Sequence, residues 1–258
     1  MIRKANPSDK QGVMKFCENT FSWGDYIKDV WDYWLSEGNL HVFEKNKPVG
    51  ISHAVFLKNH VWIEGIRVAP EFRRQGLASR LIENIESLAV RKNICISLML
   101  IDTQNSPSLY LAQKSGYIVS QTWNFYSLLP KKKKSENISF EKIIKENDFP
   151  HYVKSWRWIS LDDETISVLE SENRIIHSGY GADKTMAILE DSEHFKKTLI
   201  VTLFAGSKNT LKNIISFLQN YGFEKNYERL QILTKEELPK LDNLDCKISF
   251  HLMRKLLS

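Results

Sequence analysis

The stretch EGIRVAPEFRRQGLASRLI, residues 64–82, is the most informative part of the chain. A run of mostly aliphatic residues is stopped by Pro70, an arginine-rich turn follows, and a helical pattern begins directly after Gly76. From Leu77 onward, apolar residues recur at the spacing of one buried helix face. The stretch therefore predicts a strand, a tight turn and an amphipathic helix.

The turn has the features of an anion site. The first turn of a helix has unpaired N–H groups and a partial positive charge. Gly76 lets a ligand approach the backbone because it has no Cβ, and Arg73 and Arg74 add charged donors at the same end. The alternative is an ordinary strand–turn–helix junction with solvated arginines. The strand, the proline and the uninterrupted helix favour a site for a phosphate-bearing ligand.

Residues 73–78, Arg-Arg-Gln-Gly-Leu-Ala, match the Arg/Gln-x-x-Gly-x-Gly/Ala motif of the Gcn5-related N-acetyltransferase (GNAT) superfamily. The segment resembles neither a dinucleotide fingerprint nor a Walker loop. In the family the loop amides hold the pyrophosphate of acetyl-CoA. The resemblance implies that acetyl-CoA is the co-substrate here, and that it is bound by Ile66, Arg67, Val68, Arg73, Arg74, Gln75, Gly76, Leu77, Ala78 and Ser79.

Residues 95–117 agree with this resemblance. Residues 95–101 have the pattern of a buried strand, residues 105–107 (Asn-Ser-Pro) open a helix, and Gly116 closes it. The order resembles the family's next unit, Asn-x-x-Ala-x-x-Leu-Tyr-x-x-x-Gly-Phe. This implies two more contacts to the coenzyme, Asn105 on the pantetheine arm and Ser108.

One position departs from the family. The residue that is often a tyrosine, and often protonates the leaving thiolate, is Ala112 here. Tyr110 is two residues earlier, about 200° away around a helix, so we do not assign it as the acid. A thiol with a pKa around 8.5 leaves tolerably without strong assistance. Tyr117 and ordered water remain possible donors.

Glu64 is the leading candidate for the general base. On a regular strand it shares a face with Trp62, Ile66 and Val68, and a carboxylate on an apolar face has a raised pKa. The alternative is that Glu64 is a structural partner of Arg67 or another cation. His53 is a weaker second base. The resemblance also implies a free backbone N–H for the oxyanion on the splayed strand that ends at Val68.

A second informative cluster is expected to select the acceptor. A Gly-Asp turn flanked by aromatic residues can place a carboxylate beside an apolar wall, which suits an amine. The blocks Trp-Gly-Asp-Tyr and Glu-Gly-Ile-Arg-Val-Ala-Pro are similar to those of two-part archaeal acetyltransferases related to the vertebrate histidine N-acetyltransferases. The resemblance implies a free amino acid or another α-amine as acceptor, and we expect it to contact Trp23, Asp25, Tyr26 and Glu64.

The sequence predicts two domains of the α/β class. Residues 1–130 are expected to form a catalytic GNAT domain with a mixed, mostly antiparallel sheet flanked by helices, residues 131–137 a basic linker, and residues 138–258 a degenerate GNAT-like domain. The strand, helix and Gly-aromatic order at 198–223 repeats that at 95–117, without the arginine loop. The alternative is that any α/β unit has this order. One coenzyme site per chain follows.

Composition narrows the function classes further. The chain has 258 residues and a formal net charge of +5. The three cysteines have neither disulfide nor zinc spacing and are expected to be reduced core residues; we expect a cytoplasmic protein with no metal and no membrane partner. The lysine run at 131–134 has no interleaved aromatic residues, so we do not expect a nucleic-acid partner. The oligomeric state is left open.

Three functions compete at this point. The first is an acetyl-CoA-dependent N-acetyltransferase that acts on a small primary amine by direct transfer in a ternary complex. The second acetylates a protein lysine or N-terminus, and an open acceptor groove would favour it. The third is a non-catalytic acyl-CoA sensor, suggested by Ala112 and the degenerate second half.

Overall fold

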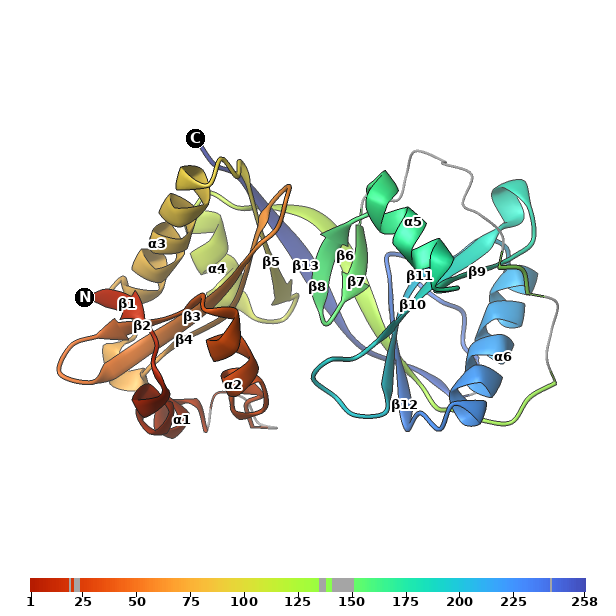
Figure 1. The fold of residues 1–258 in the computed structure, drawn as a ribbon, viewed down its shortest axis with the longest axis horizontal. Helices are drawn as coiled ribbons and strands as arrows, with labels where there is room; N and C mark the ends of the chain where they lie inside the picture. The colour runs from red at the N-terminus through yellow and green to blue at the C-terminus, as the bar shows by residue number, and fades with distance from the viewer. Residues whose placement is uncertain (19, 21–23, 135–137, 141–150, 242) are drawn as a thin grey trace. The chain divides into compact units, whose positions relative to one another are not determined.

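The computed structural model describes the whole chain except residues 19, 21–23, 135–137, 141–150 and 242. The chain forms two compact units, which we call unit 1 (Met1–Ser120 and His251–Ser258) and unit 2 (Gln121–Phe250). Each is a mixed α/β unit with mostly antiparallel strands, as expected for the fold class (Figure 1). No helix in the described part of the chain is long and apolar enough to cross a membrane.

Unit 1 carries the segment that the sequence singled out. Strands β1 to β4 are antiparallel neighbours in chain order, and β5 is parallel to β4. The elements are β1 (Ile2–Lys4), η1 (Pro7–Asp9), α1 (Lys10–Cys17), α2 (Ile27–Glu37), β2 (Leu40–Glu44), β3 (Pro48–Phe56), β4 (Val61–Val68), η2 (Pro70–Phe72), α3 (Leu77–Arg91), β5 (Ile96–Asp102) and α4 (Ser106–Lys114).

The helices of unit 1 cover both faces of these strands. Leu40 and Val42 pack in a core cluster with α1 and α2, whereas Phe43 packs with Leu77 and Leu81 of α3. Because successive side chains of a strand point to opposite faces, α3 covers the face opposite to α1 and α2.

Strand β4 separates from β5 halfway along its length. The pairing of the two strands ends at Ile63 and Met99, although β4 continues to Val68 and β5 to Asp102. On its other edge β4 contains a bulge, because Gly65 and Ile66 oppose the single residue Ser52 of β3. Within the described part of the chain, the backbone of residues 64–68 that faces away from β3 therefore has no strand partner in β5.

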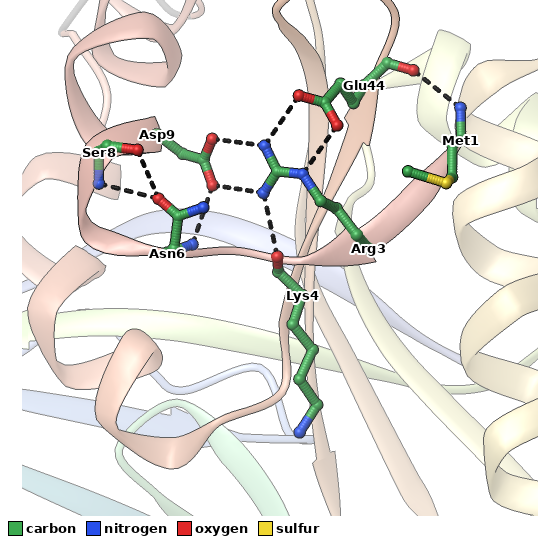
Figure 2. Close-up of polar contacts among 7 residues, drawn as sticks. All are labelled: Met1, Arg3, Lys4, Asn6, Ser8, Asp9 and Glu44. Carbon is green, nitrogen blue, oxygen red and sulfur yellow. Dashed lines mark hydrogen bonds and ion pairs between the residues drawn. The ribbon is translucent and has the colours of Figure 1, made fainter.

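The first strand is fixed by an ion-pair network (Figure 2). The Arg3 guanidinium donates to both Asp9 oxygens at 2.7 and 2.8 Å and to both Glu44 oxygens at 2.8 and 3.1 Å. Asp9 also accepts from the Asn6 amide, at the start of η1. The network ties β1 to β2 and to the beginning of α1.

Unit 2 is built around a second parallel pair. Strands β9, β10 and β11 are antiparallel, β11 is parallel to β12, and β12 is antiparallel to β6. The elements are β6 (Ile118–Leu128), β7 (His151–Lys154), β8 (Arg157–Ser160), α5 (Asp163–Ser171), β9 (Ile175–Ser178), η3 (Gly181–Asp183), β10 (Thr185–Asp191), β11 (Thr198–Phe204), α6 (Lys208–Glu224), β12 (Arg229–Thr234) and β13 (Leu244–Leu256).

The pairing corrects the alignment of the repeat. The predicted strand at 198–204 is confirmed, but Gly222 lies inside α6 instead of after it. Strand β11, helix α6 and the parallel strand β12 correspond in order and pairing to β4, α3 and β5. In order and pairing, the segment in unit 2 therefore matches residues 61–102 and not 95–117.

Two strands each have residues in both units. β6 begins in unit 1 and then pairs with β12 of unit 2, while the last residues of β13 lie beside β5 of unit 1. In unit 1, the Leu257 amide donates to the Cys95 carbonyl at 2.8 Å, and Met253 is fully buried in the core with α3 and α4. The chain thus passes from one unit to the other after Ser120 and after Phe250. Residues 135–137 of the predicted linker lie outside the described residues, so the linker stays a prediction.

The cysteine prediction is only partly right. Cys17 is buried, whereas Cys95 and Cys246 are exposed, and all three are free thiols. Cys95 directly precedes β5, and Cys246 lies early in β13 between Asp245 and Lys247, which are also exposed.

Candidate functional site

The arginine loop connects β4 to α3 through two left-handed residues. After η2, Arg74 has a φ of 61° and Gly76 a φ of 77°. All residues from Arg73 to Gly76 are exposed, and a Cβ built on Gly76 would meet no heavy atom within 4 Å. The loop is therefore open to solvent, and a bound group can approach its backbone at Gly76.

The start of α3 offers its backbone to that space. No side chain caps the helix at Gly76, so the amides of its first turn keep their hydrogen-bonding capacity. Arg73 turns back and donates from Nε to the Val68 carbonyl at 3.1 Å, which closes the loop onto β4. The uncapped amides, the left-handed loop and its arginines fit a pyrophosphate.

The corresponding place in unit 2 is filled. The side chain of Ser207 caps α6, and the Ser207 amide donates to the Asp183 carbonyl at 3.2 Å. A Cβ on Gly206 would come within 2.5 Å of backbone oxygens of Asp183 and Lys184. Since protein atoms occupy this helix start, α6 cannot present its amides to a ligand as α3 does.

Glu64 lies where β4 leaves β5, and both of its carboxylate oxygens are held. Oε1 is 2.9 Å from Nδ1 of His53, and Oε2 accepts from Nε1 of Trp62 at 3.0 Å. The side chain is 15% exposed. The bulge at Gly65 breaks the regular alternation, so the expected common face with Ile66 and Val68 is wrong.

Arg67 is paired with Asp25. Its Nε donates to Asp25 Oδ2 at 2.7 Å and its Nη2 to Oδ1 at 3.2 Å. The Asp25 side chain is 2% exposed, and its Oδ1 also accepts from the Ile27 amide at the start of α2. The expectation of an open carboxylate for an amine at Asp25 therefore does not match the geometry.

Beside this ion pair, the Tyr26 ring makes a cation–π contact with Arg67 and an aromatic contact with Trp34. The Arg67 guanidinium lies 5.3 Å from the Tyr26 ring centre, and the ring meets Trp34 edge-on at 6.0 Å. Burial raises the pKa of the Tyr26 hydroxyl. Tyr26 is thus a neutral wall near Glu64, while the predicted contact Trp23 lies outside the described residues.

Helix α4 has the predicted cap at its start, but Tyr117, a possible proton donor to the leaving thiolate, is not placed for that role. Asn105 Oδ1 accepts from the Ser108 amide at 3.2 Å, and Ala112 is buried in the core. The Tyr117 hydroxyl is buried and contacts Ser97 Oγ at 2.6 Å and Glu86 Oε1 at 2.9 Å, and burial raises its pKa strongly. Tyr117 therefore belongs to the core.

Sequence reasoning missed two side chains around Glu64. Trp34 stacks on His53 with ring centres 4.7 Å apart, and Glu37 Oε2 lies 3.4 Å from His53 Nε2. Both belong to α2, where Trp34 has the spacing of a core residue and Glu37 only that of a helix end. A glycine inside a strand pattern was the available signal for the bulge at Gly65.

Comparisons with known proteins agree with this site. Residues 13–117 match the acetyltransferase (GNAT) family. In fold, the chain is similar to a GCN5-related N-acetyltransferase from Sphaerobacter thermophilus (TM-score 0.66, 12% identity, 100% of this chain and 95% of that one). It is also similar to proposed acetyltransferases from Thermoplasma acidophilum (TM-score 0.69, 16% identity, 99% of both chains) and Pyrococcus horikoshii (TM-score 0.56, 16% identity, 99% and 89%).

The matched range contains β4, the arginine loop, α3, β5 and α4. The two-unit fold extends over nearly the whole length of all three structures. Residues 13–117 of this chain therefore match the acetyltransferase (GNAT) family, and this match, together with the open arginine loop, supports an acetyl-CoA-dependent N-acetyltransferase.

Proposed function

We propose that the chain acetylates the primary amine of a small molecule, such as an amino acid, by direct transfer in a ternary complex. The observation that carries the proposal is the position of Glu64, a largely buried carboxylate where β4 leaves β5, on the strand that leads into the open loop at α3. The loop would bind the phosphates of the coenzyme, and the carboxylate would accept a proton from an amine.

Unit 1 would hold the coenzyme through backbone groups. The first-turn amides of α3, with Arg73 and Arg74, would bind the phosphates, and residues 64–68 would offer the β4 edge. Acetyl-CoA supplies an acetyl group on a thioester whose thiolate can leave. The role of Asn105 and Ser108 in binding the pantetheine arm remains part of this proposal.

Glu64 would take the proton that the amine must lose. An ammonium group has no lone pair, so transfer needs a base within hydrogen-bond reach. In the net reaction, R–NH₃⁺ and acetyl-CoA give the amide, free coenzyme A and one proton. The N–H groups of His53 and Trp62 would fix the orientation of the Glu64 carboxylate. Its remaining lone pairs would then keep a constant direction toward a bound amine.

The surroundings of Glu64 support a small acceptor. The carboxylate is 15% exposed and lies near the partly buried ring of Tyr26, so a bulky flat partner surface would not reach it. Because Asp25 is neutralised by Arg67, a second carboxylate for the amine is not offered there. A single amine on a slender group fits this environment.

The direct test is thiol release from acetyl-CoA with a panel of free amino acids and small amines. A set of peptides with free N-termini and internal lysines provides the comparison. We expect turnover with at least one small amine and at least tenfold lower kcat/KM for every peptide. Turnover confined to peptides would overturn the acceptor class, and no thiol release with any amine would overturn the proposed activity.

A further inference from the structure

Three titratable side chains form a compact cluster that includes Glu64. His53 on β3 has Nδ1 2.9 Å from Glu64 Oε1 and Nε2 3.4 Å from Glu37 Oε2. The His53 side chain is fully buried, whereas Glu37 is 21% exposed. One imidazole therefore contacts two carboxylates that come from different elements, α2 and β4, and one nitrogen or oxygen atom from each of the three side chains lies within 4.8 Å of the other two.

The packing of the His53 ring opposes a ring flip that would swap the positions of Nδ1 and Nε2. Its ring is parallel to that of Trp34, with 4.7 Å between centres and an interplanar angle of 4°. A buried, stacked ring keeps one nitrogen toward Glu64 and the other toward Glu37.

The contact with the Glu64 carboxylate places a hydrogen on Nδ1 of His53. An ionised carboxylate only accepts hydrogen bonds, so the His53 nitrogen beside Glu64 must be the donor. Nε2 of His53 is buried and has no hydrogen-bond partner in the described part of the chain, although Glu37 Oε2 lies 3.4 Å away. A bare ring nitrogen and a carboxylate oxygen at this distance repel each other unless a proton lies between them.

We propose that His53 is a positioning residue that binds a second proton on Nε2, shared with Glu37, and that orients Glu64 through Nδ1–H. The proposal rests on the role of Glu64 in the proposed function. The resulting imidazolium favours the ionised form of Glu64, because opposite charges stabilise each other. The amine proton passes to Glu64 alone, and His53 keeps both of its protons during the reaction.

The charged neighbours of His53 allow this state. Carboxylates face it from α2 (Glu37) and from β4 (Glu64), and one further imidazole, His41 on β2, lies close enough to interact with it electrostatically. Burial lowers the pKa of His41, which favours its neutral form and limits the repulsion. With both carboxylates ionised, the net charge of the three side chains stays negative even after His53 is protonated.

The kinetic test is the pH dependence of kcat/KM with the best small amine. In His53→Asn, the amide nitrogen replaces Nδ1–H without a charge, so Glu64 should stay oriented but hold its proton to higher pH. We expect the acid limb to move up by about one pH unit, with activity recovered at alkaline pH. Glu37→Gln should move the limb in the same direction by less, because it also removes a negative charge within 4.8 Å of Glu64 that disfavours the ionised form of Glu64.

His60→Asn is the matched control, because His60 is another buried histidine of unit 1. It should leave the acid limb in place. An acid limb that is the same in His53→Asn, in His60→Asn and in the unmodified protein would overturn the proposal. Glu37→Gln changes a partly exposed side chain, so it preserves the test if His53→Asn does not fold.

A second measurement does not depend on activity. Nitrogen-15 NMR of the imidazole should show hydrogen on both His53 nitrogens at pH 6, and loss of the Nε2 hydrogen at lower pH in Glu37→Gln than in the unmodified protein. A neutral His53 ring at pH 6, with hydrogen on only one of its two nitrogens, would overturn the proposal. If no amine is acetylated, the proposed function fails, and this NMR result still decides the state of His53.

Discussion

The ring of Trp34 occupies the space into which Gly65 would project a Cβ. Such an atom would lie 2.4 Å from two ring carbons of Trp34. Gly65 also has a φ of 67°, which glycine adopts without strain. The same ring stacks on His53, so one tryptophan links the bulge of β4 to the partner of Glu64.

This relationship predicts a strong effect of Gly65→Ala. We expect a loss of about 3 kcal/mol in the free energy of unfolding, from backbone strain and from displacement of Trp34. The matched control is Gly38→Ala, because Gly38 has a φ of 79° but open space around its Cβ position. It should cost about 1 kcal/mol. Equal losses in urea unfolding of the two variants would contradict the role of Trp34.

The loop predicts a selective loss of coenzyme binding in Gly76→Glu. The new side chain would fill the open space and place a negative charge beside the phosphates. We expect at least a hundredfold rise in the Kd of acetyl-CoA, measured by calorimetry. Gly181→Glu is the control, since Gly181 of unit 2 is also left-handed with open space. Unchanged affinity in Gly76→Glu would rule out the loop as the phosphate site.

The Arg3 network predicts an acid-sensitive contribution to stability. Hydrogen bonds from Arg3 hold the pKa of the Asp9 carboxyl below its usual value, despite burial. A carboxyl with a lowered folded-state pKa stabilises the fold above its unfolded pKa of about 4, and this contribution is lost as the pH falls through the folded-state pKa.

Urea unfolding between pH 7 and pH 2 tests this network. Asp9→Asn should lower the stability at pH 7 and flatten its decline below pH 4. Asp32→Asn, which removes a 77% exposed carboxylate, should change neither by more than about 0.5 kcal/mol. An acid profile of Asp9→Asn parallel to that of the unmodified protein would show that Asp9 does not carry the effect.

The C-terminal strand predicts that the end of the chain stabilises unit 1. Met253→Ala removes a fully buried side chain and should cost about 2–5 kcal/mol. Leu256→Ala, in the same strand but 66% exposed, should cost less than about 0.5 kcal/mol. Acetyl-CoA should protect unit 1 of both folded variants against heat. Equal stability of the two variants would argue against insertion of β13 into unit 1.

The local elements of the site could be predicted from the sequence. Pro70, the arginines, Gly76 and the apolar spacing after Leu77 each act over a few residues, and the strand, loop and helix lie where these signals place them. The family match over residues 13–117 agrees with the same signals.

Partners distant in the sequence could not be predicted. The pairing of Asp25 with Arg67 and of Glu37 with His53 depends on how α2 packs against β3 and β4. The passage of β13 into unit 1 likewise follows from tertiary pairing, because its apolar pattern fits any sheet edge. Local propensity carries no information on these choices.

The central claim is that Glu64 accepts the proton of the amine, and its most direct test is the kcat/KM of Glu64→Gln from pH 6 to 9. Glutamine keeps the shape and can still accept from Trp62, but it takes up no proton. We expect a loss of about 10²- to 10⁴-fold at neutral pH that diminishes toward pH 9, where more of the amine is already neutral. Turnover equal to that of the unmodified protein across this range would contradict the account.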